Sequence, residues 1–384
     1  MTDESNNKAE LDIFIANNVF PEAEPIFTAR LKSLEAIRDD CYVVLDTNSL
    51  LVPYTIGKET LEQIKKTYKA LADKDCLVVP AQVAREFAKN RANKISELYK
   101  ELSKKRDEIP DLQKGTYPLL ESLEEYQETM RLEASVDKLL RDYRKRIGKV
   151  LDHIRSWTWD DPVSLLYGEL FSSGVVKDIS IDKEAIKSEL DKRQLHKIPP
   201  GYKDAGKSDS GIGDLLIWLT ILDIGRAQNK SVIFVSGDGK PDWWHQSNKE
   251  PLYPRYELVD EFRRLSGGQS FHIITFSRFL NLYGASEKVV EEVRKEEKQS
   301  VSKKLSYSYH MVAKANSYDE IQPFLLSLKD THGETYRGGM TSSENGITTM
   351  DIGFTQNVPI KVLSELAERL GIEIIHIELR LIEY

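Results

Sequence analysis

The chain has 384 residues, of which 40% are hydrophobic, and its formal net charge is -8 at pH 7. This length has room for one large domain and a smaller one, and the composition excludes a largely disordered chain. The negative net charge excludes a general electrostatic attraction to nucleic acid. Two stretches, Lys100–Arg106 and Lys138–Lys149, are nevertheless basic, and each is either a solvated helix face or a phosphate-binding surface.

The cysteines and the N-terminal segment indicate where the protein resides. Cys41 and Cys76 each begin an apolar segment and are too few for a disulfide framework, and no His/Cys group has the spacing of a zinc site. The first ten residues lack the basic and apolar parts of a secretory signal, and no apolar run approaches the ~20 residues of a membrane span. We therefore expect a cytoplasmic protein with reduced thiols and no membrane partner.

The first predicted elements alternate between helices and strands. Apolar residues at helical spacing predict a helix within Pro21–Asp40. The elements expected next are a strand from Val43 that ends at Asp46 and leads into a polar turn, a helix from near Lys58, a strand Cys76–Pro80 and a long helix from Ala81. The strands are continuously apolar rather than alternating, which indicates a parallel sheet that is covered on both faces.

A change of composition marks an insertion in this domain. Charged helical stretches at about residues 107–195 predict a helical insertion, which we expect to form a cap or arch over the open end of the sheet. A Pro/Gly/Lys/Asp loop follows, and then the apolar helix Asp214–Gln228 and the strand Ser231–Asp238. A last strand-like unit, Phe271–Gly284, closes a first domain that we place at residues 1–290.

The remaining residues predict a second, smaller domain. A charged connector at 291–304 precedes residues 305–384, in which the expected order of elements is βαββαβ. This order is typical of a ferredoxin-like α+β domain. Such domains serve many functions, so we expect only that it provides a protein partner site or a homo-oligomer contact.

Acidic residues occur where the predicted elements of the first domain end or begin. Asp46 and Asp238 end strands, Glu86 lies in the first turns of the long helix, and Asp214 opens the apolar helix, with Asp242 close behind Asp238. Each alone could be a turn former or a helix cap. Because ligands of parallel sheets bind at the carboxyl ends of the strands, we expect these side chains to meet at one edge.

A cluster of carboxylates has chemical consequences. Mutual repulsion raises the pKa of such groups unless cations neutralise them. Oxygen ligands with open positions suit Mg²⁺ or Mn²⁺, whereas zinc prefers His or Cys. These ions bind phosphate oxygens and activate water, so the pattern favours phosphodiester hydrolysis.

Four segments carry a resemblance to a known family. The stretches "VVLDTNSLLVPY", "VVPAQVAREFAKNR", "GYKDAGK…GDLLIWLTIL" and "VIFVSGDGKPDWW" resemble, in this order, the motifs of bacterial PIN-like nucleases of the PIN_8 type. The likeness covers roughly Pro21–Gly284. It implies an α/β fold with a Rossmann-like parallel sheet, metal-dependent nuclease activity mostly on RNA, and a role as a toxin or in phage defence.

The resemblance also implies roles for individual residues. Asp46, Glu86, Asp214 and Asp238 would be catalytic and hold the metal, with Asp242 as a further ligand and Asp209 as an accessory acid. Substrate contacts are expected from Asn48, Ser49, Asn90, Arg91, Lys203, Lys207 and Lys240. For Arg91 an ion pair with a structural acid is an equal alternative. Of Trp243 and Trp244, one could stack on a base, and one is expected in the core.

Three other interpretations compete with a metal-dependent endoribonuclease. "GDGKPD" fits the metal motif of haloacid-dehalogenase-type phosphatases, but Asn48 stands where their general acid, a second Asp, is required. A catalytically inactive scaffold would not need to keep a costly carboxylate cluster. A flap-type DNA nuclease uses the same chemistry, and since contacts to the 2′-hydroxyl cannot be inferred from sequence, only the resemblance favours RNA over DNA.

Overall fold

A computed structural model describes most of the chain in two compact units. The described residues are 12–111, 115, 117–172, 174–180, 182–204, 206, 211–248, 250–315, 318–332, 336–344, 347–354 and 358–383. The first unit is Met1–Val293 and the second is Arg294–Tyr384. Each unit is described below by itself.

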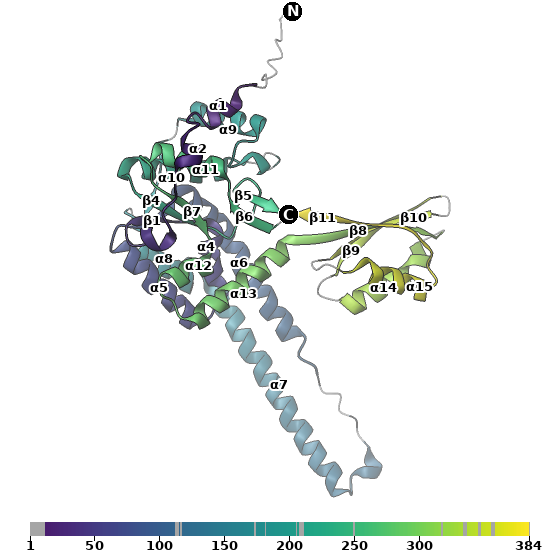
Figure 1. Ribbon diagram of the computed structural model, residues 1–384. Coiled ribbons are helices and arrows are strands. Elements are labelled where there is room, and N and C mark those ends of the chain that lie inside the picture. Colours follow the sequence, from purple (N-terminus) through teal and green to yellow (C-terminus); the bar gives the residue numbers. More distant parts are fainter. Residues whose placement is uncertain are drawn as a thin grey trace, which may run out of the picture. The chain divides into compact units, whose positions relative to one another are not determined.

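A five-stranded parallel sheet forms the centre of the first unit (Figure 1). Its order is β3-β2-β1-β4-β7, so that β1 lies in the middle. The strands are β1 Cys41–Leu45, β2 Leu77–Pro80, β3 Val176–Lys177, β4 Ser231–Val235 and β7 Phe271–Ile274. Every residue of β2 and β4 is buried, as expected for a sheet with both faces covered. The predicted α/β fold is thus confirmed.

Helices follow nearly every strand of this unit. They are α1 Ile15–Val19, α2 Pro25–Thr28, α3 Leu34–Ile37, α4 Thr47–Leu51, α5 Lys58–Ala72, α6 Ala81–Asp107, α7 Glu124–Ser156, α8 Pro162–Leu170, α9 Lys183–His196, α10 Ile212–Gln228, α11 Tyr256–Leu265, α12 Phe276–Leu282 and α13 Glu287–Lys304, with 3-10 turns η1 Val52–Tyr54, η2 Pro118–Leu120 and η3 Tyr202–Asp204. Among the helices described, none is both long and apolar enough to cross a membrane.

Some elements differ from the sequence-based expectation. The single helix expected within Pro21–Asp40 is wrong: α2 ends at Thr28, Ala29 is extended, and α3 starts anew because the Ser33 side chain accepts a hydrogen bond from the Ala36 amide. Three elements were not anticipated, namely β3, α11 and a hairpin of β5 Trp244–Ser247 and β6 Glu250–Pro254. The short strand β3 lies inside the expected insertion, so the chain returns to the sheet there.

Aromatic side chains fill the core between the sheet and its helices. Trp218 of α10 is fully buried and packs edge-on against Phe271 of β7, with ring centroids 5.1 Å apart. A Cβ atom at Gly225 would overlap the ring of Phe262, so this glycine allows α10 and α11 to approach closely. The helix α10 is therefore apolar around most of its circumference because most of its sides are buried, as predicted.

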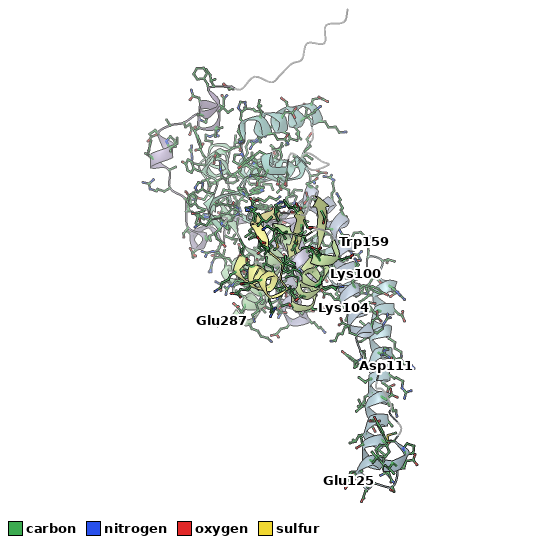
Figure 2. The ribbon with its side chains drawn as sticks, turned by 90° about the vertical axis from the view of Figure 1, so that its right-hand side faces the viewer. Lys100, Lys104, Asp111, Glu125, Trp159 and Glu287 are labelled. Carbon is green, nitrogen blue, oxygen red and sulfur yellow. The ribbon has the colours of Figure 1, made fainter. Side chains whose placement is uncertain are left out.

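The helices α6 and α7 form a long hairpin, here called the arm. Figures 1 and 2 show it extending away from the sheet, with Asp111 and Glu125 lying along it toward its tip. A small apolar cluster joins the two helices near the base; its members are Tyr99, Leu102, Ile109, Leu140, Ile147 and Leu151. The expected cap or arch over the open end of the sheet is thus wrong: α6 contacts the sheet only at its start, and α7 packs on α6 and extends away from the sheet.

The second unit has the predicted ferredoxin-like topology. The helix α13 leads from the first unit into β8 Leu305–Lys314, and the elements that follow are α14 Tyr318–His332, β9 Tyr336–Glu344, β10 Ile347–Phe354, α15 Ile360–Arg369 and β11 Ile374–Glu383. Its antiparallel sheet has the order β11-β8-β10-β9. A separate core includes Phe324, Phe354 and Leu363. The charged stretch expected as a connector, 291–304, is helical.

Candidate active site

Asp46 lies at the carboxyl end of the central strand and caps the next helix. Its Oδ1 accepts a hydrogen bond of 2.7 Å from the Thr47 amide at the start of α4. Its Oδ2 accepts bonds of 2.6 Å from Asn48 Nδ2 and from Ser236 Oγ, which follows β4. The polar turn expected after Asp46 is therefore a short helix. These three donors stabilise a nearly buried carboxylate.

Glu86 approaches Asp46 from the long helix α6. Thr47 connects the two acids, because its amide binds Asp46 while its Oγ1 donates a 2.5 Å hydrogen bond to Glu86 Oε2. Gln82, one turn earlier in α6, donates to Glu86 Oε1 at 3.0 Å. A Cβ atom at Gly213 would lie 2.7 Å from Glu86 Oε1, so only glycine leaves room for this carboxylate beside α10. The glycine thus lets Glu86 lie against the first turn of α10, which also carries Asp214.

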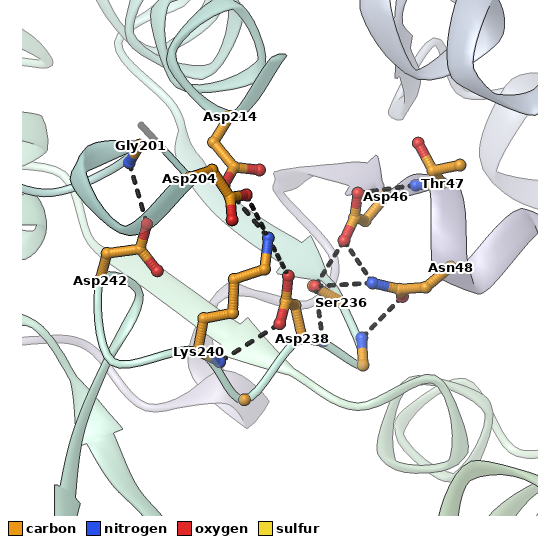
Figure 3. Close-up of polar contacts among 12 residues, drawn as sticks. Asp46, Thr47, Asn48, Gly201, Asp204, Asp214, Ser236, Asp238, Lys240 and Asp242 are labelled. Atoms are coloured by element: carbon orange, nitrogen blue, oxygen red, sulfur yellow. Dashed lines mark hydrogen bonds and ion pairs between the residues drawn. The ribbon is translucent and has the colours of Figure 1, made fainter. Parts of the chain in front are cut away.

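Three further carboxylates converge on one lysine, as Figure 3 shows. Lys240 Nζ lies 2.9 Å from Asp204 Oδ2, 2.9 Å from Asp238 Oδ2 and 3.4 Å from Asp214 Oδ2. The three acids come from η3, from α10 and from the loop after β4. Burial alone would lower the pKa of Lys240, but the charges of Asp214 and Asp238 outweigh it and raise that pKa well above its usual range. A charged ammonium group is therefore held at the meeting point of these acids.

The carboxylates lie close enough to shift one another's titration. Burial raises the pKa of Asp46 to about 6, and the charges of Asp238 and Glu86 add to this rise. Burial likewise raises the pKa of Asp214 to about 7, although Lys240 opposes the rise. Neighbouring acids with raised pKa values at one edge of a sheet are characteristic of functional sites.

Asp242 lies beneath this cluster in a fully buried position. Its Oδ2 accepts a 3.0 Å hydrogen bond from the Gly201 amide, whereas its buried Oδ1 has no hydrogen-bond partner among the described residues. Burial raises the pKa of this carboxyl group. An unpaired acceptor next to a set of acids is consistent with a site that takes up a cation.

The loop that carries Asp238 and Lys240 is anchored by the two tryptophans. Trp243 is buried against Phe234 and Trp218, so this residue is the core member of the pair. Trp244 Nε1 donates a 2.8 Å hydrogen bond to the carbonyl oxygen of Asp238. Trp243 is thus the tryptophan expected in the core, whereas base stacking by the half-buried Trp244 stays a prediction.

Several residues expected to contact substrate have internal partners instead. Ser49 is buried and donates to the Val235 carbonyl oxygen at 2.8 Å, so it joins α4 to β4. The Arg91 guanidinium is buried 2.5 Å from Asp161, and the alternative of a structural ion pair therefore holds. Asn48 binds Asp46 and the Gly237 amide. The prediction of substrate contact is wrong for Ser49 and Arg91, because both polar groups are enclosed by protein.

The remaining predicted contacts divide into three groups. Lys240 contacts acids inside the site and not the solvent-facing edge. Lys203 is exposed on η3, and Asn90 is half-buried on α6, one turn beyond Glu86. Lys207 and Asp209 lie outside the described residues.

Some members of the site were missed by sequence reasoning. Asp204 lies in the quoted motif "GYKDAGK", and its position four residues after a Pro-Pro pair gave no signal of its own. Ser236 directly follows β4, as Asp46 directly follows β1, and Thr47 is the next residue after Asp46. The strand-end criterion would have found both hydroxyl residues had it included hydroxyl groups.

The residues fit a hard divalent cation by their chemistry. The donors are all carboxylate oxygens, as Mg²⁺ and Mn²⁺ prefer, and three of them already surround a positive charge. Within the described residues no group of three or more His, Cys, Asp or Glu side chains is placed so that it could hold a metal ion as it stands. An ion therefore requires Lys240 to move, or the acids to turn toward it.

A parallel α/β sheet with clustered carboxylates at its carboxyl edge is typical of proteins that bind a ligand or a divalent cation at that edge. Residues 42–258 match the model of a family described as the PIN like domain. Since the match covers more than half of the chain, the protein belongs to the PIN-like domain family. This family consists generally of nucleases, which bind nucleic acid and usually use divalent metal ions. No curated protein and no solved structure matches the chain.

The raised pKa of Asp214 predicts a pH-dependent effect of its replacement. A carboxyl group whose pKa rises on folding from 3.8 to about 7 stays protonated in the folded state, and it lowers stability progressively as pH rises through that window. Asp214→Asn should therefore raise the free energy of unfolding at about pH 8 by up to about 4 kcal/mol, since the shift spans about three pKa units and one unit corresponds to about 1.4 kcal/mol. The gain should shrink at about pH 5.

Thermal unfolding at both pH values measures this effect. Asp223→Asn provides the control, because Asp223 lies on the same helix with its side chain 58% exposed, and it should change neither melting temperature. A gain for Asp214→Asn that is equal at both pH values would contradict the predicted linkage.

Proposed function

We propose that the protein is a Mg²⁺- or Mn²⁺-dependent endoribonuclease of the cytoplasm, with a role as a toxin or in phage defence. The observation that carries this proposal is the meeting of Asp46, Glu86, Asp214 and Asp238 at one edge of the sheet of a PIN-like domain. RNA as the substrate, and the biological role, rest on the resemblance of the motifs described above. The second unit is proposed to bind a protein partner or another copy of the chain.

Each acid has a position that suits a distinct part of the reaction. Asp46, Asp214 and Asp238 would hold one or two ions, which when bound neutralise a phosphate and lower the pKa of water. Glu86 would orient the attacking water and accept its proton, because Thr47 and Gln82 fix both oxygens of its carboxylate. Asn48 and Ser236 hold Asp46 in place through its second oxygen.

Lys240 has the role of an internal counter-ion in this proposal. Without a metal, its ammonium group neutralises Asp204, Asp214 and Asp238. A divalent cation competes for the same oxygens, so the side chain would leave when the metal binds and become available to the substrate phosphate. This explains why one residue can be both a partner of the acids and a candidate for substrate contact.

The competing phosphatase interpretation has less support. Its mechanism needs a general acid two residues after the first Asp, and Asn48 there is engaged by Asp46, Ser236 and Gly237. The match to the PIN-like family also includes Asp46 and the "GDGKPD" segment, on which the phosphatase interpretation rested. A flap-type DNA nuclease keeps less support as well, because the arm does not arch over the carboxyl edge of the sheet.

Cleavage assays on purified protein test the proposed function. Labelled tRNA, single-stranded RNA and single-stranded DNA are incubated with Mn²⁺ or with EDTA. Cleavage of RNA should require Mn²⁺, and Asp46→Asn and Asp238→Asn should each lower its rate by at least about 100-fold, because each removes several kcal/mol of transition-state stabilisation. Asp223→Asn should cleave normally.

Other outcomes would overturn this function. Full activity of Asp46→Asn would show that the carboxylate cluster is not the active site. Hydrolysis of p-nitrophenyl phosphate without cleavage of any polymer would favour a phosphatase. Absence of turnover together with tight binding of another protein would favour an inactive scaffold.

Replacement of Gly213 tests the effect of the position of Glu86 on RNA cleavage separately from any effect on the stability of the fold. In Gly213→Ala the new Cβ would displace the Glu86 carboxylate, and RNA cleavage should fall about 10-fold to 100-fold. The melting temperature should stay equal or rise, because alanine favours a helix by ~1 kcal/mol over glycine. Gly168→Ala on α8 is the matched control, since no heavy atom lies within 4 Å of its added Cβ. Equal activity of Gly213→Ala and wild type would contradict the assigned place of Glu86.

Replacement of Lys240 tests its role as a counter-ion through metal binding. Lys240→Ala should lower the melting temperature in EDTA, because three neighbouring carboxylates lose their partner. Titration with Mn²⁺ should restore stability, with an apparent Kd about tenfold below that of wild type. Lys203→Ala, which removes an exposed lysine nearby, is the control. Equal Mn²⁺ affinity of Lys240→Ala and wild type would show that lysine and metal do not share a site.

A further inference from the structure

One side of the helix α7 carries an exposed row of apolar residues. Leu132 and Leu139 are each 67% exposed, Val136 is 43% exposed, Tyr143 is 44% exposed and Val150 is 48% exposed. We call these five residues the exposed stripe. Their spacing of four, three, four and seven residues is the heptad repeat of a coiled-coil seam.

A second apolar row on α7 is already covered. Leu140, Ile147 and Leu151 pack against Tyr99 and Leu102 of α6. Leu140 and Leu151 each directly follow a residue of the exposed stripe, and Ile147 follows Arg146, which lies at a position of the same heptad pattern. The two rows therefore run side by side along the helix. The arm therefore has one seam that is filled within the chain and a neighbouring seam that no described element covers.

The outer half of α7 has little support from its own chain. The helix has 33 residues and is about 50 Å long, whereas the apolar contacts with α6 involve residues from Leu140 onward. Toward the tip, Tyr117 contacts Tyr126 through a hydrogen bond from its amide to Tyr126 Oη and through an edge-on ring contact, and no residue there belongs to the apolar cluster with α6. Helices in proteins gain most of their stability by burying an apolar face. The exposed stripe is the apolar face available for this purpose.

The charges of α7 specify how a second helix would align with it. Residues 124–136 contain four glutamates and one arginine, whereas residues 137–156 contain seven lysines or arginines and three aspartates. Two copies in antiparallel orientation place the acidic half of each against the basic half of the other. Two copies in parallel orientation place like charges together and put Arg146, at a seam position, against itself.

We propose that the exposed stripe binds the same stripe of a second copy of this chain, in antiparallel orientation about a two-fold axis between Val136 and Leu139. Val136 then faces Leu139 of the second copy, and Leu132 faces Tyr143. Glu128 and Lys149, at the flanking positions, form an ion pair between copies twice in the symmetric dimer. Because the apolar contacts with α6 begin only at Leu140, the centre of this dimer is a pair of α7 helices.

Sedimentation velocity of the full chain measures the oligomeric state. Wild type should sediment at twice the monomer mass of 44.0 kDa, and Leu132→Glu/Leu139→Glu should sediment at the monomer mass with an unchanged melting temperature. Leu165→Glu is the matched control, because this leucine is 58% exposed on α8 and should leave the dimer intact. A monomeric wild type at about 100 μM, or a Leu132→Glu/Leu139→Glu protein that is still dimeric, overturns the proposal.

Charge reversal tests the antiparallel alignment. Glu128→Lys should raise the dimer Kd about tenfold, and the double variant Glu128→Lys/Lys149→Glu should restore it to within about threefold. A double variant that is as weak as or weaker than Glu128→Lys overturns this alignment.

Cysteine cross-linking tests the same alignment by distance. The native thiols, Cys41 and Cys76, are buried, so disulfides between introduced cysteines can be detected without interference from them. Leu132→Cys should not cross-link to itself, because eleven residues of helix, about 16 Å, separate it from its facing position. A mixture of Leu132→Cys and Tyr143→Cys proteins should form disulfide-linked dimers. Cross-linking of Leu132→Cys alone would indicate parallel helices and overturn the proposal.

Nucleic acid is the other ligand that the basic half of α7 could attract, and the same variants distinguish it. If wild type is monomeric and binds labelled RNA, and Leu132→Glu/Leu139→Glu loses that binding, the arm is a nucleic-acid surface and the proposal of a dimer is wrong. If Leu132→Glu/Leu139→Glu becomes monomeric and RNA cleavage is unchanged, the dimer stands apart from the nuclease function.

Discussion

The burial of several carboxylates at one edge of a parallel sheet is the constraint on which this structure depends. Water is a far better environment for a carboxylate than a protein interior, so each buried acid requires a donor or a cation. In the PIN-like domain described here, Asp46 receives three hydrogen bonds, Glu86 receives two, and Lys240 neutralises the remaining acids. The raised pKa values of Asp46 and Asp214 show that this compensation is incomplete.

The parts around the site follow from that constraint. The helix α4 starts at Asp46 because its free amide groups supply one of the needed donors. Thr47 serves both Asp46 and Glu86, and Gly213 leaves the space in which Glu86 reaches the other acids. The two tryptophans after Asp242 hold the loop in which Asp238 and Lys240 lie. A set of acids that would repel one another is thus kept together by uncharged neighbours and by the ammonium group of Lys240.

The arm and the second unit have a different physical basis from that of the site. The arm begins at the site, because Glu86 lies in the first turns of α6, but its outer part consists of α7 residues with an exposed apolar row in a heptad pattern. The second unit has its own core and lies beyond residue 258, where the match to the PIN-like family ends. The functions proposed for the site, the arm and the second unit therefore depend on separate contacts.

The sequence by itself determined the α/β class, the ferredoxin-like second unit and the acids at the element ends, because hydrophobic periodicity and strand-end position are local properties. Only the tertiary structure decided which polar groups face one another. Arg91 pairs with Asp161, seventy residues away in sequence, and Lys240 is enclosed by acids from three segments. Such pairings depend on how separate elements pack. From sequence alone, an arginine or a lysine at these positions could equally form a structural ion pair or bind substrate. The direction of the arm was decided in the same way, by packing between α6 and α7 that charge composition does not specify.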